Sequence, residues 1–156
     1  MNCFASLLLL FALLSGKTNH DVQMTQFELS QQKGTLALTI KVEKMDFFRS
    51  WKGFEFLAMN QQKAIINDYL QHNTFWSFNG LPFSLCTYEI QEDNEHFFIR
   101  ANFENAPLKI VQVRFRNRFL IEEIKGHLNI IHINLNEQLR SFKMDKKRQV
   151  ITLEYK

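Results

Sequence analysis

Apolar and polar residues alternate with a period of two along most of this chain. The clearest example is residues 35–43, where Leu36, Leu38, Ile40 and Val42 alternate with small or polar side chains. Successive side chains of a β-strand point to opposite faces, so this segment is predicted to be a strand with one buried face. Each of these side chains contributes ~1.5–3 kcal/mol when it is buried, so we expect the strand to anchor a core.

Other segments predict strands by the same pattern. A strand is expected over residues 21–30, with a bulge because the apolar phase changes between Met24 and Phe27. Asn79-Gly80, which lies between aromatic residues, predicts a hairpin turn. Three later strands have apolar rows that are expected to face the core: Phe97, Ile99, Ala101 and Phe103; Val111, Val113 and Phe115; and Ile131, Ile133 and Leu135. Two last strands are expected near residues 140–144 and 149–155.

One region has helical spacing instead. The stripe at this spacing consists of Ile65, Ile66, Tyr69 and Leu70. We expect the helix to pack this stripe against a sheet, with Asn60 as its N-cap and Asn73 at its end. Asp46 is expected to cap a short turn before it.

Together these elements predict a mainly β fold. About seven to nine short strands with one helical insertion after the second strand are typical of an antiparallel, immunoglobulin-like β-sandwich. We expect residues 21–156 to form this fold as a single domain, because about 140 residues make one ordinary domain.

Residues 1–16 have the pattern of a secretory signal peptide. The run CFASLLLLFALLSG fits the apolar region of such a signal, ~7–15 residues, and is shorter than the ~20 residues of a membrane span. Cleavage between residues 16 and 20 is expected to release the domain into the periplasm or the medium, with no stable transmembrane span. An uncleaved leader would instead anchor the domain outside the cytoplasm. Cys86 is then the one remaining cysteine, and its apolar surroundings predict a buried, inert thiol.

Charge singles out one short segment. The net charge of +3 is too small to indicate a nucleic-acid partner. Arg114, Arg116 and Arg118, however, alternate along one predicted strand and form a basic row. This row is a candidate interaction surface for an anionic partner, such as a phosphate, an acidic glycan or another protein. The alternative is a solvated face whose arginines are balanced by Glu side chains on neighbouring strands.

Three histidines are candidate metal ligands: His20, His127 and His132. His20 would lie near the new N-terminus, where a free amine and an imidazole bind copper or nickel. His127 and His132 are five residues apart, which on a strand places their rings on opposite faces, whereas zinc needs three or four convergent ligands. The alternative is that none of them binds a metal. His20 would then lie in an ordinary chain terminus, His127 in a loop and His132 at the surface.

Sequence motifs give no catalytic class. The chain has no GxSxG or HExxH motif and no Gly-rich phosphate loop. The adjacent acids Glu122 and Glu123 do not provide two carboxylates that face each other across a cleft. We therefore expect a protein that is not an enzyme, and no cofactor is assigned.

The order of several short motifs resembles one family. His20 is followed by an extended strand, by LALTIKV running into Asp46, by a helix ending DYL, by FWSFNG, and later by NRFLIEE and NIIHI. This order resembles the exported bacterial proteins classed as domain of unknown function 6702, which are small, β-rich and carry a His close to the new N-terminus. The resemblance places His20 at that His, and Asn129 with His132 in a late strand motif. A further similarity to the extracytoplasmic domain of nickel-permease-like membrane proteins implies metal handling.

These observations support three functional hypotheses. The first is a non-catalytic binding or accessory module of the periplasm or cell envelope. The second is binding or delivery of copper, nickel or zinc through the three histidines, with a metal transporter as partner. The third is a protein-interaction module that presents an edge strand to an envelope protein, with the arginine row steering the encounter.

Overall fold

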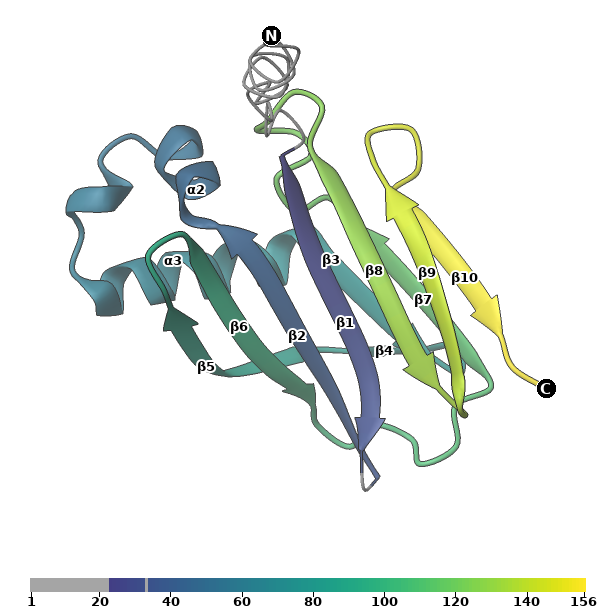
Figure 1. Cartoon of the computed structure of the whole chain (residues 1–156). Helices are drawn as coiled ribbons and strands as arrows, with labels where there is room; N and C mark the ends of the chain where they lie inside the picture. The colour runs from purple at the N-terminus through teal and green to yellow at the C-terminus, as the bar shows by residue number, and fades with distance from the viewer. Residues whose placement is uncertain (1–22, 33) are drawn as a thin grey trace, which may run out of the picture.

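The computed structural model describes residues 23–32 and 34–156 (Figure 1). The expected signal peptide, its cleavage site and His20 lie outside the described residues. The described chain contains ten β-strands, two α-helices and one short 3₁₀-helix. No helix within it is long and apolar enough to cross a membrane.

The strands form two sheets. The large sheet has the order β5-β6-β2-β1-β8-β9, and the small sheet has the order β10-β7-β3-β4. The strands of the large sheet are β1 (Met24–Gln32), β2 (Thr35–Glu43), β5 (Leu85–Glu92), β6 (His96–Phe103), β8 (Leu128–Leu135) and β9 (Gln138–Met144). Those of the small sheet are β3 (Thr74–Phe78), β4 (Leu81–Phe83), β7 (Gln112–Asn117) and β10 (Val150–Glu154). The mainly β prediction is confirmed, although β1 and β8 pair in parallel in a fold that was predicted to be antiparallel.

The period-two rows face the core where they were predicted to do so. The rows of β2, β6 and β8 are buried throughout. In β7, Val113 and Phe115 are buried, whereas Val111 precedes the strand and is exposed. Asn79 and Gly80 form the predicted turn between β3 and β4, and both have the positive φ that a tight hairpin requires.

Strand β1 has no bulge, so that prediction was wrong. Its pairing with β2 runs without interruption from Gln26 to Gln32. The inward positions are Thr25, Phe27 and Leu29, all with no exposed surface. A buried threonine, rather than a change of phase, therefore interrupts the apolar pattern.

Aromatic side chains join the two sheets. Phe27 of the large sheet lies 5.8 Å from Phe115 of the small sheet, measured between ring centroids. Phe103 of the large sheet lies 5.4 Å from Trp76 and 5.0 Å from Phe78, both of the small sheet. Such pairs add about 0.5–1.5 kcal/mol each to the free energy of burial, so these rings fix one sheet against the other.

The helical insertion follows β2, as predicted. It contains α2 (Lys44–Ser50), the 3₁₀-helix (Phe54–Phe56) and α3 (Met59–Asn73). Figure 1 shows α3 behind the β5–β6–β2 half of the large sheet, with strands of the small sheet behind the other half. Ile66 and Leu70 of the predicted stripe are fully buried against the core.

Three side chains lie elsewhere than the sequence predicted. Asp46 caps nothing, because it lies in the first turn of α2 with its side chain fully buried. Helix α3 begins one residue before Asn60. Cys86 is exposed, because its neighbour Leu85 takes the inward position on β5.

The strand register can be tested at β1. Phe27→Ala is expected to lower the free energy of unfolding by about 3–5 kcal/mol, because it leaves a cavity between the two sheets. The neighbouring Gln26→Ala, on the outer face, is expected to change it by less than about 0.5 kcal/mol. Denaturant unfolding measures both. Similar losses for the two variants would contradict the register, since a slip of one residue exchanges the two faces.

Candidate functional site

The predicted arginine row lies on the outer face of the small sheet. Val113, Phe115 and Asn117 turn inward along β7, so Arg114 and Arg116 point outward and are exposed. Arg118 follows the strand directly and is also exposed. The structure therefore places Arg114 and Arg116 on one face of the small sheet, and Arg118 just beyond the end of β7.

Neutral side chains flank two of these arginines, Arg114 and Arg116. Arg114 lies between Ser77 of β3 and Thr152 of β10. Arg116 lies between Phe75 of β3 and Val150 of β10, and its guanidinium lies 5.7 Å from the centroid of the Phe75 ring. The cross-strand glutamates that would make the row an ordinary balanced face are therefore missing at both positions.

No described carboxylate forms an ion pair with Arg114, Arg116 or Arg118. The acid on β10, Glu154, is opposite Gln112 rather than opposite an arginine. An exposed guanidinium keeps five N–H donors in a fixed fork, which matches carboxylate and phosphate groups. The row can therefore accept an external anion without first breaking an internal ion pair.

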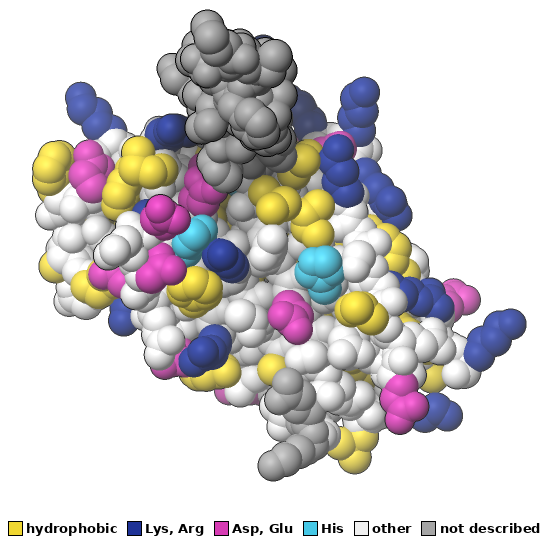
Figure 2. Space-filling view, viewed as in Figure 1, with side chains coloured by type: hydrophobic (Ala, Val, Ile, Leu, Met, Phe, Trp, Pro, Cys, Tyr) yellow, Lys and Arg dark blue, Asp and Glu magenta, His cyan; other side chains and the backbone are white. Residues whose placement is uncertain are grey.

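The wider charge distribution places the row in a basic region. Residues 109–156 contain eleven Lys or Arg and five Asp or Glu, whereas residues 23–108 contain seven and ten. Figure 2 shows the same separation, with Lys and Arg along the margin that carries β9 and β10 and acids gathered near α2 and β6. The field of the basic half would attract an anion toward the side of the molecule that carries the arginine row.

A second group of polar residues is buried where α2 meets the large sheet. It consists of Thr25 on β1, Asp46 on α2, His127 before β8 and Asn129 on β8, and none of the four side chains is more than slightly exposed. A hydrogen bond of 3.0 Å joins Thr25 Oγ1 and His127 Nε2. His127 Nδ1 lies 3.8 Å from Asp46 Oδ2, and the Asn129 amide donates to the backbone oxygen of Phe119.

Burial shifts the ionisation of this buried group. Loss of solvation lowers the pKa of His127 to about 4, so its imidazole is neutral at pH 7. Loss of solvation also raises the pKa of Asp46 to about 6; Glu43 raises it further, and Arg49 opposes them. Both Asp46 oxygens and His127 Nδ1 lack hydrogen-bond partners among the described residues. The group therefore holds a carboxylate that is poorly compensated at neutral pH.

The order carboxylate, imidazole, hydroxyl is that of a relay which activates a nucleophile. A cavity of about 470 Å³ lies on one side of His127, between the turns at residues 121–128 and 145–147. Thr25 does not line that cavity, and its side chain has no exposed surface. The hydroxyl therefore does not reach a substrate in this conformation, and the group connects α2, β1 and β8 instead.

Little in the sequence predicts this group. Its members are far apart in the chain and form no motif, and the distance from Thr25 to His127 is 102 residues. The available signal was a threonine in the buried phase of β1. The change of apolar phase there, which predicts a bulge, instead marks a polar side chain with a buried partner.

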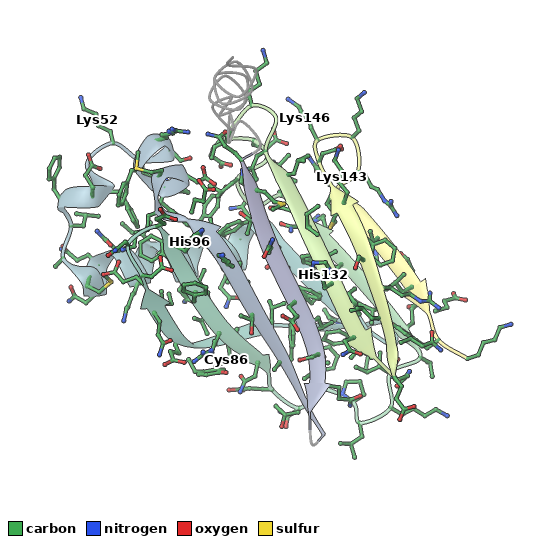
Figure 3. All side chains as sticks on the ribbon, in the orientation of Figure 1. Lys52, Cys86, His96, His132, Lys143 and Lys146 are labelled. Atoms are coloured by element: carbon green, nitrogen blue, oxygen red, sulfur yellow. The ribbon has the colours of Figure 1, made fainter. Side chains whose placement is uncertain are left out.

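The predicted histidine ligands are not brought together. His127 faces inward, whereas His132 lies on the outer face of the large sheet, between Glu28 and Ser141. Figure 3 shows His132 on the near face of β8, and a 2.7 Å hydrogen bond joins its Nδ1 to Ser141 Oγ. Within the described ranges, no three His, Cys, Asp or Glu side chains are grouped to hold a metal. His20 lies outside those ranges.

Comparison with protein-family models and with curated proteins finds no match for this chain. Inferences about function therefore rest on its own residues. Of the two groups of polar residues, the arginine row is accessible and the group around His127 is closed. The arginine row is the better candidate for recognition of a partner.

The buried carboxylate can be tested by its effect on stability. The pKa of Asp46 is raised in the folded state, so its protonated form is favoured there and stability is lost as the pH rises from 3.8 through about 6. The loss amounts to about 3 kcal/mol. Asp46→Asn removes this titration and retains that of His127. The variant is therefore expected to gain about 3 kcal/mol relative to the native protein between about pH 4 and pH 7. Denaturant unfolding at both pH values checks this, and a difference that does not change with pH would contradict it.

Proposed function

We propose that the chain is an exported, non-catalytic binding or accessory module of the cell envelope, and that it recognises an anionic partner through the outer face of the small sheet. The observation that carries this proposal is the row of Arg114, Arg116 and Arg118, exposed and flanked by neutral residues at Arg114 and Arg116. The accessible arginines favour binding as its role, whereas the Thr25 hydroxyl of the buried group around His127 has no exposed surface.

Physical chemistry favours a role in binding for this row. Like charges on one face repel each other and are normally offset by acids on the next strands. Here the directly opposite neighbours are Phe75, Ser77, Val150 and Thr152, so no acid opposite Arg114 or Arg116 offsets the repulsion in the free protein. An anionic partner relieves it and forms charge-assisted hydrogen bonds at the same time. Attraction over the basic region also raises the association rate.

We also propose that the two sheets form an immunoglobulin-like sandwich. That fold has the strand order A-B-E-D in one sheet and C-F-G in the other. The orders β1-β2-β6-β5 and β3-β7-β10 follow the same path when A to G are assigned to these strands in chain order. The β8–β9 hairpin is then an insertion between the last two strands, and it extends the large sheet beyond β1 through the parallel pair. Many immunoglobulin-like domains are binding modules at cell surfaces, which agrees with the proposed role.

Export and kinship rest on the sequence. The pattern of residues 1–16 supports secretion, and the order of short motifs supports kinship with the family classed as domain of unknown function 6702. Metal delivery is the weaker alternative, because it depends on His20 without help from a His127–His132 pair. An envelope protein is the partner class that suits both the leader and the arginine row.

A charge-reversal experiment tests the binding face. The double variant Arg114→Glu/Arg116→Glu is expected to weaken binding to immobilised polyglutamate or heparin by about tenfold or more, because two contacts of about 1 kcal/mol each are lost. The native interaction is expected to weaken as salt rises. Surface plasmon resonance at two salt concentrations measures both effects.

The matched control is Lys52→Glu/Lys63→Glu, which changes the net charge equally and lies in the acidic half of the chain. It is expected to alter affinity by no more than about twofold, because Lys52 and Lys63 lie outside the small sheet and surface charges away from a contact are screened. Equal losses for the two double variants would show an effect of net charge alone. That result would overturn the assignment of binding to the small sheet.

A further inference from the structure

We propose that the open edge of β10 binds an extended acidic segment of a partner protein, which adds to the small sheet as a fifth strand beside the arginine row. This inference rests on the proposed function, because it uses the same face and names the form of the partner. Four features of the described chain support it: the protection of the other edges, the backbone geometry of β10, its side chains and the charge beside it.

Three of the four sheet edges carry features that discourage strand addition. Strand β4 has three residues and contains Pro82, which lacks an N–H. Strand β5 has a register shift between Thr87 and Glu89, and a bulge disturbs an edge. Strand β9 carries Arg140 and Lys143, and charged residues guard edges against pairing. Strand β10 has regular pairing along its five residues and contains no Pro, and its one charged side chain is Glu154 at its end.

The backbone of β10 offers hydrogen-bonding groups to that edge. The Asn117 N–H donates to the Gln149 oxygen and the Tyr155 N–H to the Val111 oxygen, each at 2.8 Å. In an antiparallel ladder, bonded pairs alternate with unbonded pairs. Residues 149, 151, 153 and 155 therefore bond to β7. The N–H and C=O groups of residues 150, 152 and 154 point to the open edge, where an added strand would pair with them.

The side chains of β10 define what an added strand should carry. Val150 and Thr152 are short and lie on the outer face, next to Arg116 and Arg114. Strands are about 4.8 Å apart, so acids on an added strand would lie one strand beyond the arginines, with only these short side chains between. The long arginine side chains can extend across Val150 and Thr152 to reach these acids. Acids opposite Val150 and Thr152 are therefore favoured.

Glu154 restricts which partner residue can lie opposite it on the same face. Like charges directly opposite each other are destabilising, so the partner residue opposite Glu154 should be neutral or basic. On the other face, Ile151 and Leu153 are buried at the margin of the core. Partner residues on that face should be apolar. The favoured partner is thus a strand that alternates acidic and apolar residues and is neutral or basic at one end.

A second copy of this chain fits the edge less well. The β10 strand of a second copy would offer a single acid, Glu154, to the arginine row. An antiparallel pair of β10 strands would also place two arginine rows on the same side of one continuous sheet. Charge complementarity therefore favours a different, acidic chain.

The experiment measures binding of a labelled peptide with the sequence Lys-Val-Glu-Val-Glu-Val-Thr by fluorescence anisotropy. Thr152→Pro removes an N–H that points to the open edge and leaves the ladder bonds to β7 in place. Its matched control, Thr152→Val, keeps that N–H. We expect Thr152→Pro to weaken binding by about tenfold or more and Thr152→Val by no more than about twofold. Because the proline variant can disturb the fold, a peptide N-methylated at alternate amides is also tested on the native protein, with the same loss expected.

The outcomes separate this inference from the proposed function. Loss with Thr152→Pro, with N-methylation and with Arg114→Glu supports strand addition. Loss with Arg114→Glu alone overturns strand addition and leaves the anion-binding face intact. No loss with any change overturns both. Self-association of the native protein in sedimentation, abolished by Thr152→Pro, would identify a second copy as the occupant and overturn the acidic partner.

Discussion

The stack of Trp76 on Phe115 holds the small sheet in its orientation. The two residues are cross-strand neighbours on β3 and β7, and their rings lie nearly parallel with centroids 3.7 Å apart. Phe27 reaches Phe115 from the large sheet, so one ring is fixed both within its sheet and across the core. Since side chains alternate along a strand, burying Phe115 forces Arg114 and Arg116 to the outside. The exposure of the arginine row is thus a consequence of the aromatic core.

The buried group around His127 opposes this stabilisation. Its polar side chains occupy positions that apolar residues would fill at less cost. The Asp46 oxygens, which have no hydrogen-bond partner among the described residues, carry a desolvation penalty. In return, a hydrogen bond joins β1 to the turn before β8, next to the one parallel pair in the sheets. This hydrogen bond would be lost in another register, so it favours the observed pairing. The group thus lowers the stability of the fold while it connects α2, β1 and β8.

The features that could be predicted from the sequence are those that depend on residues close together along the chain. Strict alternation placed Leu36 to Val42 inward, the Asn79-Gly80 turn formed, and Ile66 and Leu70 packed as a helical stripe. The outward direction of the arginines followed from the same period. The neutral flanks of Arg114 and Arg116 did not, because they come from β3 and β10, which are distant in sequence. The parallel pair, buried Thr25 and exposed Cys86 were missed for the same reason, since each depends on which strand lies beside it.

The most direct test of the central claim is amide hydrogen exchange along β10 by NMR. In the free protein, the amides of Ile151 and Leu153 should exchange slowly because they bond to β7, and those of Thr152 and Glu154 should exchange fast. A saturating acidic strand peptide should then slow exchange at Thr152 and Glu154 in particular. Protection that arises along β5 or β9 instead, or peptide binding that leaves β10 unprotected, would contradict the account.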